Sequence, residues 1–127
     1  MKINVGLIGK GKWGSKIKNN LSQISNLKFV CGKKQEYFSK LKKNKIEWIF
    51  IATPNKTHYK IVKECLKNDV NVFCEKPLCL SYKKAKSLVD LSKKKKLKLY
   101  ISDIYEYHSN KIKKLQKFNS VYRCKLV

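Results

Sequence analysis

Short apolar runs alternate along the chain with stretches in which apolar residues recur every three or four positions. The runs predict β-strands, and the periodic stretches between them predict helices. Strands that alternate with helices in this way are typical of a parallel α/β sheet covered on both faces. We therefore expect a doubly wound, mostly parallel sheet in three layers. The predicted strands cover residues 3–8, 27–31, 46–52, 70–74 and 97–102.

The first predicted helix carries Trp13, Ile17, Leu21 and Ile24 at intervals of four, four and three residues. This spacing predicts that the four side chains share one apolar face. The fourth predicted strand is followed by Ser81, a suitable N-cap for the helix that comes next. Further helices are expected at residues 35–43, from residue 57 onward and at residues 110–118.

Three glycines follow the first predicted strand directly, with the spacing G-x-G-x-x-G. Gly9 permits a tight turn, Gly11 lets the backbone approach a pyrophosphate, and Gly14 lets the helix pack close to the strand. The unpaired N–H groups at the helix start would then face the phosphates. The alternative is a glycine turn that only joins strand to helix. The intervening residues, Lys10, Lys12 and Trp13, belong to the same candidate cofactor site.

The chain has 127 residues and a formal net charge of +23. Such a charge raises the possibility of a nucleic-acid partner. Of the 31 basic residues, however, only Arg123 is an arginine, the residue that proteins usually use for bidentate base and phosphate contacts. The lysines are also spread along the whole chain. Specific nucleic-acid binding is therefore the least favoured function, although weak nonspecific binding at low salt is expected.

The five cysteines form no C-x-x-C pair and fall mostly in predicted strands and helices. This pattern favours small buried thiols over a disulfide framework or a metal site. The chain enters its first strand without a secretory leader, and no apolar run reaches membrane-spanning length. We expect a cytoplasmic protein.

Two further motifs stand at the carboxyl ends of later predicted strands. Thr53-Pro54-Asn55 is followed by His58, and Glu75-Lys76-Pro77 closes the fourth strand. In an open α/β sheet the ligand crevice lies at these strand ends. Taken in order with the glycine loop, the motifs resemble the N-terminal domain of the Gfo/Idh/MocA oxidoreductases. The aromatic segment at residues 103–108 also looks like one that follows the fifth strand in that family.

The resemblance implies a role for each matching residue. The glycine loop would hold the cofactor pyrophosphate, and Lys76 would be the catalytic lysine that contacts both cofactor and substrate oxygen. His58 would lie along the cofactor near the ribose and nicotinamide. For Lys76 the alternative is an ordinary surface lysine, and for His58 it is a residue that packs beneath the loop. The remaining cofactor contacts implied by the family are Thr53, Pro54, Asn55, Glu75 and Pro77. Pro77 is also a candidate cis proline.

One departure from the dinucleotide pattern concerns the second strand. An NAD-preferring site has an acidic residue about 20 positions after the glycines, where it binds the ribose 2′-hydroxyl. Here that place holds Gly32, followed by Lys33 and Lys34. Two lysines would attract a 2′-phosphate, so the sequence predicts NADP(H) in preference to NAD(H).

The second departure concerns length. Family members continue into a second α/β domain that supplies most substrate contacts, whereas the sequence ends at Val127. We expect a dinucleotide-binding domain at residues 1–120 and, at residues 121–127, an edge strand or the start of the second domain. The resemblance implies an NAD(P)-dependent oxidoreductase acting on a sugar or polyol. A dinucleotide-binding module without turnover is the alternative. A homo-oligomer is expected because Tyr122, Cys124 and Leu126 would form an exposed edge.

Overall fold

The computed structural model describes residues 2–32 and 34–102, with side chains left undescribed at residues 34–36. Strands and helices alternate as the sequence predicts, and every predicted element within these residues is present. Boundaries differ from the predictions by one to three residues. The elements are β1 (Asn4–Ile8), α1 (Lys12–Ile24), β2 (Asn26–Cys31), α2 (Lys34–Lys43), β3 (Trp48–Ile51), α3 (Asn55–Lys67), β4 (Asn71–Glu75), α4 (Tyr82–Lys94) and β5 (Leu99–Ser102).

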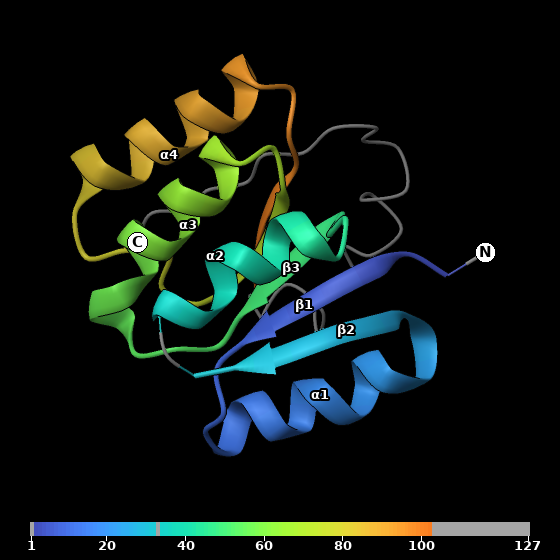
Figure 1. The fold of residues 1–127 in the computed structure, drawn as a ribbon. Helices are drawn as coiled ribbons and strands as arrows, with labels where there is room; N and C mark the ends of the chain where they lie inside the picture. The colour runs from blue at the N-terminus through green and yellow to red at the C-terminus, as the bar shows by residue number, and fades with distance from the viewer. Residues whose placement is uncertain (1, 33, 103–127) are drawn as a thin grey trace, which may run out of the picture.

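The five strands form one parallel sheet in the order β2-β1-β3-β4-β5. The chain moves outward from β1 to β2, then crosses back to β3 and continues in the opposite direction. Because β–α–β crossovers are right-handed, this reversal puts α1 on one face and the later helices on the other. Figure 1 shows this division, with α1 apart from α2, α3 and α4. The predicted doubly wound sheet is confirmed.

Each face of the sheet has its own apolar core. On the side of α2, α3 and α4, Ile8, Ile51 and Cys74 belong to a large buried cluster. On the side of α1 the cluster is smaller and centres on Val5 and Leu7. Neighbouring residues of β1 thus point to opposite faces, as the period of two in a strand requires. Central strands buried on both faces explain why the sequence shows nearly unbroken apolar runs.

The face predicted for α1 is only partly correct. Leu21 is buried, but Trp13 and Ile24 are 47% and 73% exposed. The buried residues are Gly14, Leu21 and Ser25, which lie seven and eleven positions apart from Gly14 and therefore share one side of a helix. The close approach of Gly14 to the loop after β1 rotates the helix toward this side, and Trp13 is turned outward.

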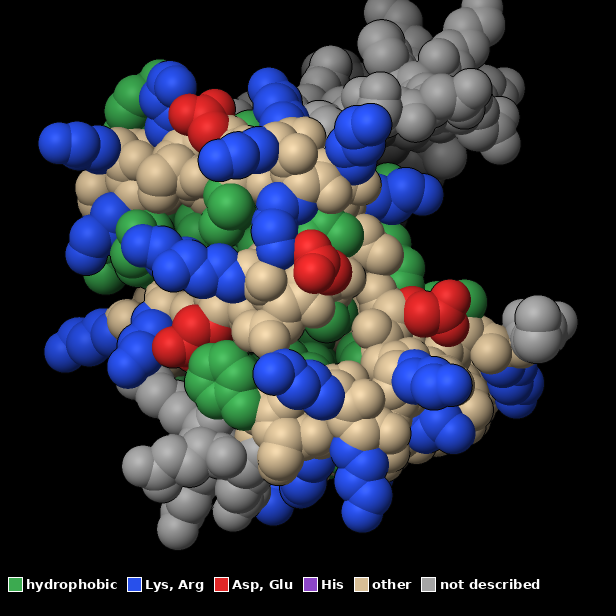
Figure 2. Space-filling view, turned by 45° about the horizontal axis from the view of Figure 1, so that its top comes forward, with side chains coloured by type: hydrophobic (Ala, Val, Ile, Leu, Met, Phe, Trp, Pro, Cys, Tyr) green, Lys and Arg blue, Asp and Glu red, His purple; other side chains and the backbone are tan. Residues whose placement is uncertain are grey.

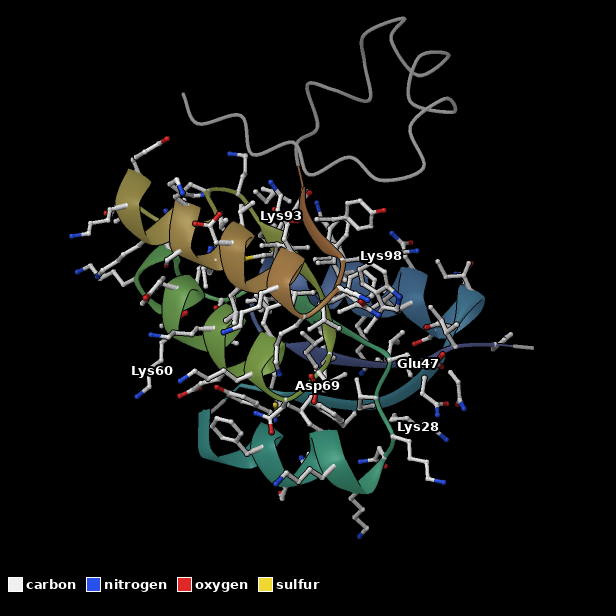
Figure 3. All side chains as sticks on the ribbon, turned by 90° about the horizontal axis from the view of Figure 1, so that it is seen from above. Lys28, Glu47, Lys60, Asp69, Lys93 and Lys98 are labelled. Carbon is white, nitrogen blue, oxygen red and sulfur yellow. The ribbon has the colours of Figure 1, made fainter. Side chains whose placement is uncertain are left out.

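Polar side chains join the five strands where they begin. Asn26 Nδ2 donates to Asn4 Oδ1 at 2.8 Å, and the Asn4 backbone N–H donates to Glu47 Oε2 at 2.8 Å. Asn71 Nδ2 donates to the Glu47 carbonyl at 3.0 Å, and the Lys98 N–H donates to Asn71 Oδ1 at 2.9 Å. We call these five residues the amino-end ladder. Glu47 and Lys98 are labelled in Figure 3.

Some sequence predictions lie outside the described residues. These are the aromatic segment at 103–108, the helix at 110–118, the proposed edge at 121–127 and the expected oligomer contact there. Ser81, by contrast, is confirmed as the N-cap of α4, since its hydroxyl accepts a hydrogen bond from the Lys84 N–H. Within residues 2–32 and 34–102, no helix is long and apolar enough to cross a membrane.

Candidate functional site

The three sequence motifs lie at one edge of the sheet. The glycine loop follows β1, Thr53 follows β3, and Lys76 follows β4, and these three strands are neighbours. The strand order reverses between β1 and β3, which is the switch point where open α/β sheets bind ligands. The fold therefore brings the predicted site residues together at the place where a crevice is expected.

Gly9 and Gly14 are required by contacts within the protein. Gly9 has φ +135°, and a Cβ there would lie 2.3 Å from the Ala52 carbonyl oxygen. A Cβ on Gly14 would lie 2.2 Å from the Gly9 carbonyl oxygen. Both distances are far below van der Waals contact. The predicted tight turn at Gly9 and the close helix packing at Gly14 are thus present in the structure.

Gly11 differs from its two neighbours in the motif. A Cβ built on Gly11 would meet no atom within 4 Å among the described residues, and its backbone has the ordinary values φ −72° and ψ −175°. It is also the N-cap of α1, and no side chain bonds the first turn there. Nothing in this part of the protein requires glycine at the position, so the open space above Gly11 is available to a ligand that approaches the helix start.

The other residues of the glycine loop face solvent. Lys10, Lys12 and Trp13 are all exposed, and the Lys16 ammonium lies 5.0 Å from the Trp13 ring centroid. The Lys10 side chain runs beside Gly32, where an added Cβ would lie 3.5 Å from Lys10 Cδ. Lys10 therefore reaches the end of β2, a neighbour that sequence reasoning did not identify.

Gly32 is exposed at the end of β2, next to the loop after β1. The backbone N–H of Gly9 donates to the Cys31 carbonyl at 2.8 Å and ties the two strand ends together. Lys33 lies outside the described residues, and the side chain of Lys34, the first residue of α2, is not described. The structure thus places the backbone of Gly32 and Lys34 at this part of the predicted site.

A hydroxyl pair organises the loop after β3. The Thr57 hydroxyl lies 2.6 Å from the Thr53 hydroxyl and 2.7 Å from the Pro54 carbonyl oxygen. Asn55, which follows Pro54, is the exposed first residue of α3. Sequence reasoning did not identify Thr57 as a site residue. Because Thr53 precedes α3, helical spacing gave no signal for this pair.

His58 lies beneath this loop with its side chain fully buried. Its Nδ1 is 2.7 Å from the Pro77 carbonyl oxygen, and its Nε2 is 2.8 Å from the Thr53 carbonyl oxygen. The ring therefore bridges the loops that follow β3 and β4. Of the two roles considered from the sequence, this position matches a residue that packs under the loop.

The third motif projects from the end of β4. Lys76 and Pro77 are exposed, Glu75 is half-buried, and the Lys76–Pro77 peptide bond is cis, as predicted. Cys74, just before the motif, is buried, and its thiol pKa is raised by this burial, with a further contribution from Glu75. Since only a thiolate is an effective nucleophile, Lys76 and Glu75 carry the available chemistry of this segment.

The lysines do not gather around these motifs alone. Figure 2 shows lysine side chains dispersed over the whole visible face, with no single stripe. A nucleic-acid interface usually concentrates its basic residues on one face or along one helix. The dispersed lysines therefore give no support to a specific nucleic-acid site on this face.

Comparison with known families gives a match to the Gfo/Idh/MocA family model, which describes an oxidoreductase family with an NAD-binding Rossmann fold. The match covers residues 28–102, more than half of the chain. The matched segment ends at residue 102, where β5 and the described structure also end. It includes both motifs that follow β3 and β4.

Relatives of known sequence include enzymes with different substrates. An inositol 2-dehydrogenase of Rubrobacter xylanophilus is 39% identical over 56 residues, which are 44% of this chain and 16% of the relative. The 2,7-anhydro-N-acetylneuraminate hydratase of Escherichia coli is 27% identical over 107 residues, with 72% of this chain and 29% of the relative covered. The chain thus spans less than a third of either protein.

Solved structures share the fold. The UDP-N-acetylglucosamine 3-dehydrogenase GnnA of Acidithiobacillus ferrooxidans superposes with a TM-score of 0.74 at 22% identity, covering 91% of this chain and 43% of that protein. GenD2 from gentamicin A biosynthesis, solved in complex with NAD, superposes with a TM-score of 0.71 at 19% identity, covering 80% of this chain and 34% of that protein.

Proposed function

Since the chain belongs to the Gfo/Idh/MocA oxidoreductases, the family with an NAD-binding Rossmann fold, we propose that it is the cofactor-binding part of an NAD(P)-dependent dehydrogenase. The substrate class we propose is a sugar or polyol, because relatives named above act on inositol and on a nucleotide sugar. The dinucleotide would lie across the carboxyl ends of β1, β3 and β4.

The open space at Gly11 is the observation that carries this proposal. Gly9 and Gly14 are explained by contacts inside the protein, whereas the missing side chain at Gly11 is explained by no contact within the described residues. A pyrophosphate over the first turn of α1 would occupy that space and accept bonds from N–H groups that have no partner within the helix. The residues present therefore fit a dinucleotide.

The proposed roles at the carboxyl ends follow from position and charge. Thr53, Pro54 and Asn55 would line the cofactor after β3, and Glu75 and Lys76 would approach its nicotinamide ribose. The bound cofactor supplies hydride transfer. The exposed Lys76 ammonium would orient the substrate carbinol or carbonyl oxygen and help to move its proton.

We also propose that NADP(H) is preferred over NAD(H). The end of β2 carries Gly32 and no carboxylate that would repel a 2′-phosphate, and the Lys10 side chain lies beside Gly32. The double variant Lys33→Glu/Lys34→Glu should weaken NADPH binding much more than NADH binding. Equal losses for the two cofactors would contradict the assignment.

Tryptophan fluorescence offers a direct test of binding. Trp13 is exposed beside the glycine loop, and Trp48 stands at the opposite end of the sheet, where β3 begins. NADPH should quench a Trp48→Phe variant, which keeps Trp13, more strongly than a Trp13→Phe variant. No response to NADPH or NADH in the wild-type protein would refute the proposed function.

Turnover is tested separately with a panel of sugars and polyols, followed by nicotinamide absorbance. We expect Lys76→Met to abolish any turnover and to weaken the affinity for the dinucleotide, while the affinity for its adenine half is retained. Binding without turnover in the wild-type protein would favour the alternative function, a dinucleotide-binding module. The buried, free thiols of Cys65 and Cys74 support a cytoplasmic location for either function, because such thiols persist in a reducing compartment.

A further inference from the structure

We propose that His58 is a positioning residue that holds the loop after β3 and the loop after β4 at a fixed separation, and so sets the place of Lys76. The ring makes two short contacts, one to each loop, and both are to backbone oxygens. The proposal rests on the proposed function only for the identity of the ligand that Lys76 would meet.

The two contacts join loops that the pairing of β3 with β4 does not connect. Thr53 lies just beyond the end of β3, and Pro77 lies two residues beyond the end of β4. The last ladder pair between these strands joins Ile51 and Cys74. Beyond that pair the two segments no longer pair with each other, and the imidazole of His58 sets the spacing between them.

The chemistry of the contacts makes the bridge specific. A carbonyl oxygen only accepts hydrogen bonds, so each of the two oxygens needs an N–H on the nitrogen that faces it. No other side chain places two donors on opposite sides of one small rigid ring, so replacements can keep one contact at most.

The consequence for Lys76 follows from the chain connection. Lys76 directly precedes Pro77, and its side chain is exposed at the strand end. A fixed Pro77 carbonyl holds the peptide plane between Pro77 and Leu78. Because the proline ring locks the φ angle of Pro77, this also restricts the orientation of the Lys76–Pro77 peptide and the positions from which the ammonium can reach a ligand. Among the described residues, the His58 ring bonds the two loops and not the glycine loop, which would bind the pyrophosphate. The glycine loop should therefore retain its function when the bridge is lost.

The experiment compares a whole cofactor with its adenine half. His58→Gln and His58→Asn are titrated with NADPH and with 2′,5′-ADP, which lacks the nicotinamide half; NADH and 5′-ADP serve if the wild-type protein prefers NAD(H). We expect the affinity for the dinucleotide to fall about tenfold and the affinity for the adenine half to change less than twofold. Equal losses for both ligands, or no loss for either, would overturn the proposal.

Tyr37→Phe is the matched control. The buried Tyr37 hydroxyl donates to Glu64 on α3, the same helix that carries His58, so its loss destabilises α3 without touching the two loops. We expect this variant to bind both ligands in the wild-type ratio. A control that changed the ratio as the His58 variants do would reduce the effect to general destabilisation of α3 and would overturn the positioning role.

Two measurements need no ligand and separate this proposal from the proposed function. In the His58 variants, amide hydrogen exchange should accelerate at Thr53, Asn55, Glu75 and Lys76 beyond what Tyr37→Phe shows at equal global stability. In the wild-type protein, nitrogen-15 NMR of the His58 ring should show a slowly exchanging proton on each nitrogen. A bare ring nitrogen would leave one carbonyl unbonded and refute the bridge, even if the variants fail to fold. Wild-type protein that binds neither cofactor would refute the proposed function alone.

Discussion

The two edges of the sheet are built by different means. At the amino edge, the amino-end ladder joins all five strands through side-chain hydrogen bonds of 2.8–3.0 Å. At the carboxyl edge, two glycines bring backbone into contact with backbone, one histidine bridges two loops, and most of the motif side chains remain exposed. One edge uses its polar groups internally, and the other leaves them available.

This difference separates stability from function in the same sheet. Polar groups that bond one another at a strand end stabilise the register and offer little to a ligand. Exposed groups such as Lys76 contribute little to stability and can meet a ligand, because buried contacts hold the loops that carry them. Substitutions at the amino edge should therefore change the free energy of unfolding, whereas well-chosen substitutions at the carboxyl edge should change binding alone.

The largest expected effect on stability is at Gly14, which lies at the carboxyl edge but has a structural role. Gly14→Ala would place a Cβ 2.2 Å from the Gly9 carbonyl oxygen, and neither backbone can move away freely. We expect the free energy of unfolding to fall by about 3 kcal/mol, because overpacking against backbone forces the helix off the strand. Urea unfolding followed by circular dichroism measures the loss. Stability unchanged from wild type would contradict the close helix packing.

Tyr37→Phe provides a reference away from both edges. The Tyr37 hydroxyl donates to the Glu64 carboxylate at 2.5 Å within the helix layer. Removing this charge-assisted bond should lower the free energy of unfolding by about 2 kcal/mol at neutral pH. Denaturant unfolding measures the change, and NADPH affinity should stay at the wild-type value.

The environment of Tyr37 also predicts that the stability of the protein falls at alkaline pH. Burial raises the pKa of its phenol well above the ordinary value of 10.0, and the bond to Glu64 adds to this shift. Because the folded state holds the proton more tightly, this contribution to stability is complete below pH 10 and is lost progressively above it, by at most about 1.4 kcal/mol per pH unit. The wild-type protein should therefore lose stability faster than Tyr37→Phe above pH 10. Parallel curves would contradict the shift.

A smaller loss of stability is expected at the amino edge, at Asn71. Asn71→Ala removes the bond to the Glu47 carbonyl and the bond from the Lys98 N–H. We expect a loss of about 1–2 kcal/mol, since each bond of this kind contributes about 0.5–1.5 kcal/mol. Asn71→Asp keeps the acceptor for Lys98 but sets a carboxylate oxygen against the Glu47 carbonyl, so it should not recover the lost stability. A change in NADPH affinity in either variant would contradict the separation of the two edges.

The sequence predicted the elements and the order of the motifs because these depend on local signals. Apolar runs marked the strands, and the glycine spacing marked the turn before α1. The orientation of α1 could not be predicted, because it depends on the contact between Gly14 and Gly9, and the apolar stripe through Trp13 pointed to another side.

Tertiary contacts set the remaining limits. The place of His58 beneath two loops depends on Pro77, which is 19 residues away in the sequence and becomes a neighbour only when β3 and β4 pair. The amino-end ladder was missed for the same reason, since its members are single polar residues from separate strand starts. Neither arrangement leaves a periodic or motif signal in one stretch of sequence.

The central claim is that the carboxyl edge binds a dinucleotide over Gly11, and Gly11→Ala tests it most directly. The added methyl meets no atom within 4 Å among the described residues, so unfolding should change by less than about 1 kcal/mol, the usual cost of a lost N-cap preference. Calorimetric titration with NADPH should show binding to the wild-type protein and at least a tenfold weaker affinity for the variant. Equal affinity in the two proteins would contradict the claim.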